Sequence, residues 1–497
     1  MRVIRQIRNE PDPGGVAEGF SRIGYRIEEA LADVIDNSID ARAKHVLIVF
    51  ERDEERVQQI DIIDDGDGVD EKDLERAMQF GGRTGRSTDD LGRYGWGFKT
   101  ASLSQGQRLI LLTRTLKHTA GRQWSRASIN AGWLCDELDV EDVSDEFGRD
   151  WPGIEPRRHG TIVQWTDLDH LTLHSGSLDR ALSLMSQQIG AHLGMVFHRF
   201  LSGTASHGRR IEINFATRDT VTGAFGVVRP VGALDPFGYS KSGAPGFPMD
   251  FLVHLPETRP LVLAAHIWPA KSKDPGYRLG GRIAERQGFY FYRNDRLIQA
   301  GGWNGWRQAN AEPHLSLARV AVELSPDFDN LFRVQVQKSG LDVPPSFLAA
   351  RGEVRSKGGL TFEHYIQVAD RVYRSGSTKV PEKVLSLGAG FPKQMQERTE
   401  PGSKRGRAVD FVWEELPEDQ LFDLDRDSSR VILNSMYRAQ LNAGHKGSKT
   451  DVPLFKAMLF RLLEADLAAE RSSQRRREEV DGLNELLLLA LTYERSS

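Results

Sequence analysis

Residues 30–41 read ALADVIDNSIDA, and the fold is decided around this stretch. Its apolar side chains recur at steps of three and four, which predicts one amphipathic helix. The stripe consists of Leu31, Val34, Ile35, Ser38 and Ile39. Asp33 and Asn37 lie four residues apart and therefore share one face of that helix. A carboxylate and a carboxamide placed in this way can serve one polar site: the carboxylate orients a water molecule, and the amide oxygen binds a hard cation such as Mg2+. An ordinary solvated helix face is the alternative.

A short acidic turn follows an apolar, strand-like segment. Residues 61–70, DIIDDGDGVD, place Asp64, Gly66 and Gly68 at the spacing D-x-G-x-G. A calcium loop would need a bidentate Glu at its end, and no Glu stands at that spacing. The turn alone therefore does not identify a site, and its interpretation depends on the neighbouring motifs. A plain acidic turn is the alternative.

A glycine-rich segment comes next, in residues 92–100, GRYGWGFKT. Its glycines are Gly92, Gly95 and Gly97, and a helix is expected to begin just after them, near Phe98 or Lys99. Closely spaced glycines let backbone N–H groups approach a phosphate, and a following helix N-terminus adds a favourable dipole. The segment lacks the G-K-[ST] ending of a P-loop. The three stretches together, in this order, indicate a nucleotide site.

These motifs resemble the GHKL ATPase superfamily of gyrase B, the ninety-kilodalton heat-shock chaperones, histidine kinases and MutL, with most similarity to prokaryotic MORC-like and MutL-like ATPases. IDNSIDA resembles the N-box of that superfamily. IDDGDGV, then FGGRTGRS and LGRYGWGFKTAS, resemble the MORC lid region. The resemblance covers residues 25–170 and is weaker beyond them.

The resemblance implies roles for individual residues. Asn37 would hold Mg2+, and Asp64, in the turn with Gly66 and Gly68, would bind the adenine amino group of ATP. The segment expected to wrap the phosphates is Gly92, Arg93, Tyr94, Gly95, Trp96, Gly97, Phe98 and Lys99. A Gly-Thr pair stands where GHKL proteins supply a hydroxyl near the adenine aspartate, which assigns Thr161 to the adenine pocket.

The catalytic position departs from the family pattern. Asp33 falls where this branch carries its catalytic Glu, and Asp is one methylene shorter. Either the backbone compensates and Asp33 is the working base, or hydrolysis is slow and the protein is an ATP-operated switch; Glu29, one turn back, is the next candidate base. By analogy with the MutL and gyrase transducer, residues 332–343, FRVQVQKSGLDV, would return Lys338 to the γ-phosphate, where an ammonium stabilises charge on the leaving group.

Composition indicates a globular protein and excludes several classes. The chain has 497 residues, 39% hydrophobic and 27% charged, and a formal net charge of −4, so any nucleic-acid surface must be a local patch such as Lys404, Arg405 and Arg407. The single cysteine, Cys135, excludes a disulfide framework and a cysteine-built zinc site, and it fits the cytoplasm. The apolar run 486–491 is too short to span a membrane.

We expect an α+β protein with three folded parts. They are a GHKL (Bergerat) ATP-binding sandwich of mixed sheet and helices, a transducer-like (ribosomal S5-like) α/β domain, and a mainly helical C-terminal module. The expected boundaries are 1–24 for an N-terminal arm, 25–202 for the ATP-binding domain, 203–247 for a connector, 248–375 for the transducer-like domain, 376–408 for a linker, and 409–497 for the mixed to helical C-terminal module.

The expected function is Mg-dependent binding of ATP and slow hydrolysis to ADP, which closes an ATP-dependent homodimer. Analogy with MORC-like and MutL-like proteins implies a DNA-associated clamp in phage defence or restriction, with DNA and proteins of a defence or repair system as partners. The alternatives are a chaperone-like ATPase acting on protein clients and an ATP-binding switch with little hydrolysis. A histidine kinase is disfavoured because no phospho-accepting helix pair precedes the ATP motifs.

Overall fold

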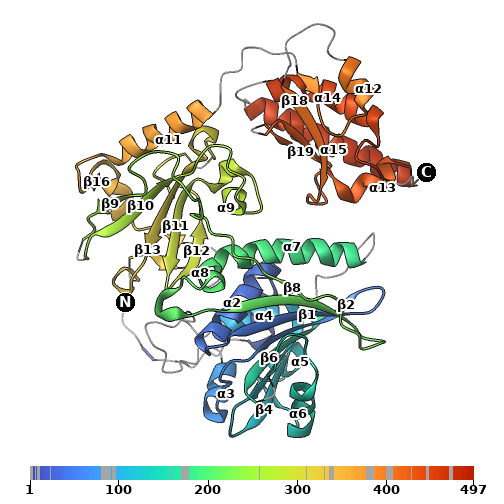
Figure 1. Cartoon of the computed structure of the whole chain (residues 1–497). Coiled ribbons are helices and arrows are strands. Elements are labelled where there is room, and N and C mark those ends of the chain that lie inside the picture. The colour runs from blue at the N-terminus through green and yellow to red at the C-terminus, as the bar shows by residue number, and fades with distance from the viewer. Residues whose placement is uncertain are drawn as a thin grey trace. The chain divides into compact units, whose positions relative to one another are not determined.

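A computed structural model gives the fold of most of the chain. It describes residues 4–5, 7, 12–22, 24–79, 91, 97–156, 158–168, 178–256, 258–308, 310–329, 331–334, 341–376, 385–398, 407–426, 428–443, 447–468 and 474–496. These residues form two compact units, Met1–Tyr373 and Arg374–Ser497. Figure 1 shows the helices and strands of both.

An eight-stranded mixed sheet forms the N-terminal part of the first unit. Its strands are β1 (His45–Arg52), β2 (Val57–Asp64), β3 (Gly106–Arg114), β4 (Thr119–Ser125), β5 (Asp136–Glu137), β6 (Gly160–Leu168), β7 (Glu212–Asp219) and β8 (Arg229–Pro230). They follow one another across the sheet in the order β5-β4-β3-β6-β2-β1-β7-β8. β1 and β7 pair in parallel, and the other neighbours pair antiparallel. Strands β7 and β8 come from the expected connector, so part of that segment completes this sheet.

Helices cover one face of this sheet. They are α1 (Pro13–Ser21), α2 (Ile27–Asp40), α4 (Gly97–Gln105) and α7 (Leu178–Val196). Leu31 and Ile35 of α2 are fully buried in one core with Ile48 of β1 and Ile62 of β2. The amphipathic helix expected at residues 30–41 is thereby confirmed. Burying its apolar stripe against the sheet fixes the orientation of its polar residues.

A second, smaller core lies on the other face of the same sheet. Helix α6 (Val140–Gly148) and the segment after it bring Phe147 and Trp151 against Leu47 and Ile63, which point to this face from β1 and β2. Because alternate residues of both strands are buried on opposite faces, the central strands read as continuous apolar runs. The sheet is therefore a buried central layer.

A second sheet forms the rest of the first unit; the part built on the first sheet, up to Pro230, is called the first domain below, and the part built on the second sheet, from Met249, the second domain. Its strands are β9 (Met249–Val253), β10 (Leu261–Ile267), β11 (Gly288–Arg293), β12 (Arg296–Ala300), β13 (Ala318–Glu323) and β16 (Arg355–Ser356), in the order β12-β11-β13-β10-β9-β16. An aromatic-rich core joins the sheet to helices α10 (Pro345–Ala349) and α11 (Phe362–Gly376). The strands expected at 249–253, 261–268, 288–293 and 317–323 are confirmed to within one residue at each end.

The second unit combines a small sheet with helices. Its strands are β17 (Ser386–Leu387), β18 (Ala408–Glu414), β19 (Phe422–Asp425) and β20 (Arg430–Asn434), in the order β17-β18-β20-β19. Its helices are α12 (Lys393–Arg398), α13 (Arg438–Leu441), α14 (Pro453–Ala468) and α15 (Gln474–Ser496). β17 and α12 fall within the expected linker, and β17 pairs in parallel with β18. The C-terminal module is thus a mixed unit, and its described part includes residues on both sides of position 408.

Short elements complete the two units. They include α3 (Glu71–Met78), α5 (Arg126–Asn130), α8 (His198–Ser202), α9 (Pro275–Arg278), β14 (Arg333–Val334) and β15 (Leu341–Asp342). Within the described residues, none of the helices has both the length and the apolar character needed to cross a membrane. The mixed sheets with helices confirm the expected α+β class.

Candidate functional site

Helix α2 presents the two residues expected at the reacting end of the site. The Asn37 side-chain amide donates to the backbone oxygen of Asp33 at 3.2 Å, which holds the two residues on one face. This bond uses the amide nitrogen and leaves the amide oxygen, the atom that a hard cation takes, as the accepting end of the side chain. The geometry expected from their four-residue spacing is therefore present.

The Asp33 carboxylate is buried and held by two side chains from outside α2. The Tyr25 hydroxyl donates to its Oδ2 at 2.9 Å, and the Arg296 guanidinium lies 3.5 Å from its Oδ1. Burial, and then the charge of Asp33, raise the pKa of Tyr25, so this phenol remains a neutral donor at physiological pH. The carboxylate thus has a hydrogen-bond donor at one oxygen and a cation facing the other.

Asp64 lies at the end of β2, in the wall of the same site. It is buried, and it accepts from the Ser38 hydroxyl at 2.8 Å and from the Gly66 backbone N–H at 2.9 Å. Burial raises the pKa of Asp64 to about 6, although these hydrogen bonds and one from the Thr161 backbone act in the opposite direction. Ser38 follows Asn37 directly, so a single hydrogen bond joins the helix segment that carries Asn37 to Asp64.

The glycines after Asp64 are required by close backbone approaches. A Cβ on Gly66 would lie 2.9 Å from the Ala41 carbonyl oxygen. Gly68 has a φ of +73°, and a Cβ there would lie 2.2 Å from the Arg114 carbonyl oxygen. The backbone N–H of Asp67 donates to the Ala41 carbonyl at 2.9 Å, which ties this turn to the end of α2. The turn is therefore a close-packed junction that other residues would disrupt.

Thr161 lies beside Asp64 in the adjacent strand. The two residues are direct partners in the antiparallel pairing of β2 with β6. Gly160, which precedes it, passes so close to β2 that a Cβ would lie 2.2 Å from the Asp64 carbonyl oxygen. The neighbouring His159 contacts the same turn, because its Nδ1 donates a hydrogen bond to the Gly66 carbonyl oxygen at 2.7 Å. The structure therefore brings Thr161, Asp64 and Gly66 together, as the sequence predicts.

The glycine-rich segment is described only in part. Gly92, Arg93, Tyr94, Gly95 and Trp96 lie outside the described residues, as does Lys338. Helix α4 begins at Gly97, with Gly97 and Phe98 half-buried.

Lys99 stands in the first turn of α4 and is buried. Its ammonium donates to the backbone oxygens of Ala77 and Gln79, at 2.5 Å and 2.9 Å. In this structure Lys99 supports the C-terminal end of α3, and its expected contact with phosphates stays a prediction.

Three residues of the site were missed at the sequence level. The helical pattern places Ser38 in the apolar stripe, whereas the structure shows it as a buried hydrogen-bond donor; a lone hydroxyl inside an apolar stripe is the signal that points to it. Tyr25 precedes α2 and carries no motif. Arg296 comes from β12, which follows the whole first sheet and the first three strands of the second sheet in sequence, so no local pattern connects it with Asp33.

The donor set suits a cation held mainly by a substrate. Among the described residues, no group of three or more His, Cys, Asp or Glu side chains could hold a metal ion. Mg2+ commonly takes one or two protein oxygens and completes its octahedron with phosphate oxygens and water. A single amide oxygen from Asn37 fits that mode of binding.

Comparison with known proteins supports a nucleotide site of this type. Residues 25–161 match a family model described as histidine kinase-, DNA gyrase B-, and HSP90-like ATPase. The matched range contains α2, the turn after β2 and the start of β6. The resemblance of this part of the chain to the GHKL superfamily is therefore confirmed.

Two curated proteins match short segments of the chain. The chain is 39% identical over 90 residues to ATPase MORC2 of Homo sapiens, covering 17% of this chain and 9% of that protein. It is 30% identical over 98 residues to Protein MICRORCHIDIA 3 of Arabidopsis thaliana, covering 18% of this chain and 16% of that protein. The chain thus spans less than a fifth of the length of these curated relatives. A crystal structure of the N-terminal domain of a DNA repair protein covers 74% of this chain at 14% identity and a TM-score of 0.40, which is too distant to bear on function.

Proposed function

We propose that this protein binds Mg-ATP at the site formed by α2, β2 and β6 and hydrolyses it slowly to ADP. The observation that carries the proposal is the hydrogen bond from Ser38 to Asp64. It connects the helix that carries Asp33 and Asn37 with the buried carboxylate beside Thr161. The end of the site at Asp33 and Asn37 can then supply a base and a cation ligand, while the end at Asp64 holds the adenine ring.

Asp64 would recognise adenine. Its carboxylate has two oxygens with room for more than one donor each, so it can accept from the exocyclic amino group while keeping its bonds to Ser38 and Gly66. Guanine carries a carbonyl at the equivalent position. Its oxygen is an acceptor and could not donate a hydrogen bond to the Asp64 carboxylate. Leaving a buried carboxylate oxygen without a donor costs binding free energy, so the site should prefer ATP to GTP.

Asn37 would hold the Mg2+ that accompanies the phosphates. When bound, the cation neutralises part of the phosphate charge and so eases attack at the γ-phosphate. We assign the phosphates themselves to residues 92–99 and to Lys338.

Asp33 would act as the general base. It leaves α2 one turn before Asn37, on the same face. One of its carboxylate oxygens accepts from the Tyr25 hydroxyl, and the other lies 3.5 Å from the Arg296 guanidinium. A base of this kind must come within hydrogen-bond reach of the attacking water. We therefore expect it to accept a proton from a water placed between α2 and the γ-phosphate.

We further infer that ATP closes a homodimer and that the closed dimer acts on DNA together with proteins of a defence or repair system. This part of the proposal rests on the resemblance to MORC-like and MutL-like ATPases. The single cysteine fits a reducing compartment, and we assign the protein to the cytoplasm.

The decisive experiment is an ATPase assay with and without DNA, paired with mass measurement in a non-hydrolysable ATP analogue. Asn37→Ala is the matched negative control, because it removes the cation ligand and leaves the apolar face of α2 intact. We expect ATP turnover that DNA stimulates and a dimer that the analogue favours. Stimulation by a client protein and none by DNA would favour a chaperone-like ATPase, and the absence of ATP binding would refute the proposal.

One observation favours a second candidate, an ATP-binding switch with little hydrolysis. The base position carries the shorter Asp, and the carboxylate is already engaged by Tyr25 and Arg296. Single-turnover measurement separates the two: the switch would bind ATP tightly and keep it uncleaved over many minutes.

A further inference from the structure

The hairpin formed by β11 and β12 of the second sheet reaches the helices of the first. β12 lies beside α7 and α8 (Figure 1). The turn between its strands is Asn294-Asp295, and both residues have positive φ values, as a tight two-residue hairpin turn requires. The residue directly after this turn is Arg296, whose side chain is almost completely buried.

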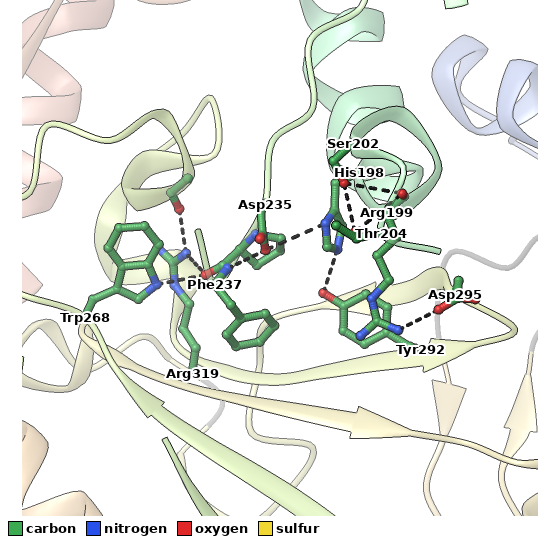
Figure 2. A network of polar contacts seen from close by, with 12 residues as sticks. His198, Arg199, Ser202, Thr204, Asp235, Phe237, Trp268, Tyr292, Asp295 and Arg319 are labelled. Carbon is green, nitrogen blue, oxygen red and sulfur yellow. Dashed lines mark hydrogen bonds and ion pairs between the residues drawn. The ribbon is translucent and has the colours of Figure 1, made fainter. Parts of the chain in front are cut away.

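Helix α8 fixes the turn of this hairpin. Arg199 donates to Asp295 at 3.1 Å, and its guanidinium lies 3.9 Å from the centre of the Tyr292 ring. His198 pairs with the Tyr292 hydroxyl at 3.0 Å, and Figure 2 shows these contacts side by side. Burial lowers the pKa of His198 to about 4, so its ring is neutral at physiological pH and the contact is an ordinary hydrogen bond.

The backbone N–H of Ser206 also donates to Asp295, at 2.7 Å. The turn is thus held from two directions by residues of the first domain. Such a set of contacts leaves little freedom for the residue that follows the turn.

Arg296 bridges two carboxylates of α2. Its Nε donates to Asp36 at 2.7 Å, and its Nη2 lies 3.5 Å from Asp33 Oδ1. Asp36 is fully buried, and the Asp33 and Arg296 side chains are nearly so. Buried charges are tolerated when they are paired with good geometry, and a planar guanidinium with several donors can serve two acceptors at once.

We propose that Arg296 is a positioning residue for ATP hydrolysis, through which the second domain holds the Asp33 carboxylate in its working orientation. The inference rests on the proposed function, because it needs Asp33 to be the base. Tyr25 donates a hydrogen bond to Oδ2, and the charged Arg296 guanidinium faces Oδ1 at 3.5 Å, so each carboxylate oxygen has a different neighbour that favours one orientation. Since Tyr25 belongs to the first domain and Arg296 to the second, the base is fully oriented only while the hairpin is docked.

This arrangement makes hydrolysis sensitive to the position of the second domain. A carboxylate that loses the cation facing one of its oxygens gains rotational freedom. Misplacement of a reacting group by about an ångström can cost on the order of a hundredfold in rate. The binding of ATP would be affected far less, since neither adenine recognition by Asp64 nor cation binding by Asn37 uses Arg296.

The test compares Arg296→Gln with Arg293→Gln. Arg293 belongs to the same hairpin and forms a buried ion pair with Asp329, with contacts of 3.0 Å and 3.1 Å, inside the second domain. Both variants remove a buried guanidinium, and only the first one faces Asp33. We expect Arg296→Gln to lower kcat about tenfold or more and to leave the Kd for ATP within about threefold, while Arg293→Gln keeps kcat within about twofold of the unmodified protein.

Arg296→Lys serves as the conservative variant. Lysine keeps the charge as a single point and lacks the fork that reaches both carboxylates. We expect it to fold and to give a kcat between those of Arg296→Gln and the unmodified protein. If Arg296→Gln fails to fold, the kcat of Arg296→Lys tests the positioning role instead. A folded Arg296→Lys with unchanged kcat would overturn the inference.

The remaining outcomes are distinct. Equal kcat values for Arg296→Gln and Arg293→Gln, or a rise in kcat for Arg296→Gln, would overturn the positioning role and leave the proposed ATPase standing. Absence of ATP turnover in the unmodified protein would instead overturn the proposed hydrolysis, and the positioning role with it.

Discussion

Lowering the pH from 7 to 5 should weaken the binding of ATP, because the adenine site depends on an ionised Asp64. Burial raises the pKa of this carboxyl from 3.8 to about 6 in the unliganded protein. The adenine amino group donates a hydrogen bond, which favours the charged form of its acceptor. ATP therefore competes with a proton at Asp64.

The magnitude follows from the fraction of Asp64 that is ionised. With a pKa of about 6, about one molecule in eleven carries the charge at pH 5, against about ten in eleven at pH 7. If ATP selects the ionised form, its Kd should rise about tenfold over this interval. Binding at pH 6 should release a fraction of a proton into the buffer.

The stability of the unliganded protein should move in the opposite direction. The folded pKa of Asp64 lies above the unfolded one, so its contribution to the free energy of unfolding is present below about pH 4 and is lost as the pH rises through about 6. The shift of about two units corresponds to about 3 kcal/mol. Asp64→Asn should consequently be neutral or stabilising at pH 7 while it weakens ATP binding.

Calorimetry with a non-hydrolysable ATP analogue, in buffers of different ionisation enthalpy, measures both the Kd and the proton release. Asp64→Asn is the control, because any pH dependence that it retains belongs to the phosphates of the nucleotide. A Kd that changes equally with pH in both proteins would refute the assignment of Asp64 to the adenine. So would equal affinity of the unmodified protein for ATP and GTP.

Further outcomes follow from the other residues of the site. Asn37→Ala should abolish tight Mg-ATP binding and leave the unfolding transition in place, because the cation loses one of its few protein ligands; calorimetry with and without Mg2+ measures this. Asp33→Asn should leave the Kd for ATP within about threefold and lower turnover about tenfold or more, and brisk turnover in that variant would show that another residue is the base. Gly68→Ala should lower the free energy of unfolding by about 2 kcal/mol or more, since its left-handed φ is combined with a carbonyl oxygen 2.2 Å from the new Cβ; Gly153→Ala, with φ of +76° and nothing within 4 Å, should cost less in the same denaturant titration. A non-hydrolysable ATP analogue should raise the dimer fraction in sedimentation, and an unchanged fraction would contradict ATP-driven closure.

The fold could be predicted well where one sequence pattern fixes one local structure. The stripe around Leu31 and Ile35 has the helical period, and the runs at 249–253 and 288–293 have the strand pattern. The C-terminal unit was harder to predict. Ser386 and Leu387 form a strand only by pairing with β18, which lies beyond the glycine- and lysine-rich segment, so their local composition indicates a linker.

The site shows the same division. Asn37, Asp64 and Thr161 could be placed because each belongs to a short motif whose spacing has a physical reason. Ser38 and Arg296 could not, because their roles come from contacts across the fold. The bond from Arg296 to Asp36 joins residues 260 positions apart. No periodicity or local motif carries information over such a separation.

The short base and the two side chains that hold it form one fitted unit. Asp33→Glu would restore the family residue, but the Asp33 side chain is only 1% exposed, with Tyr25 at 2.9 Å and Arg296 at 3.5 Å from its oxygens. An added methylene extends the side chain by about 1.5 Å, which the present contacts do not accommodate without moving one of them. Restoring the length of the base therefore also disturbs the contacts that orient it. If this protein hydrolyses ATP efficiently, the missing reach must come from how closely the nucleotide approaches α2, and not from the side chain itself.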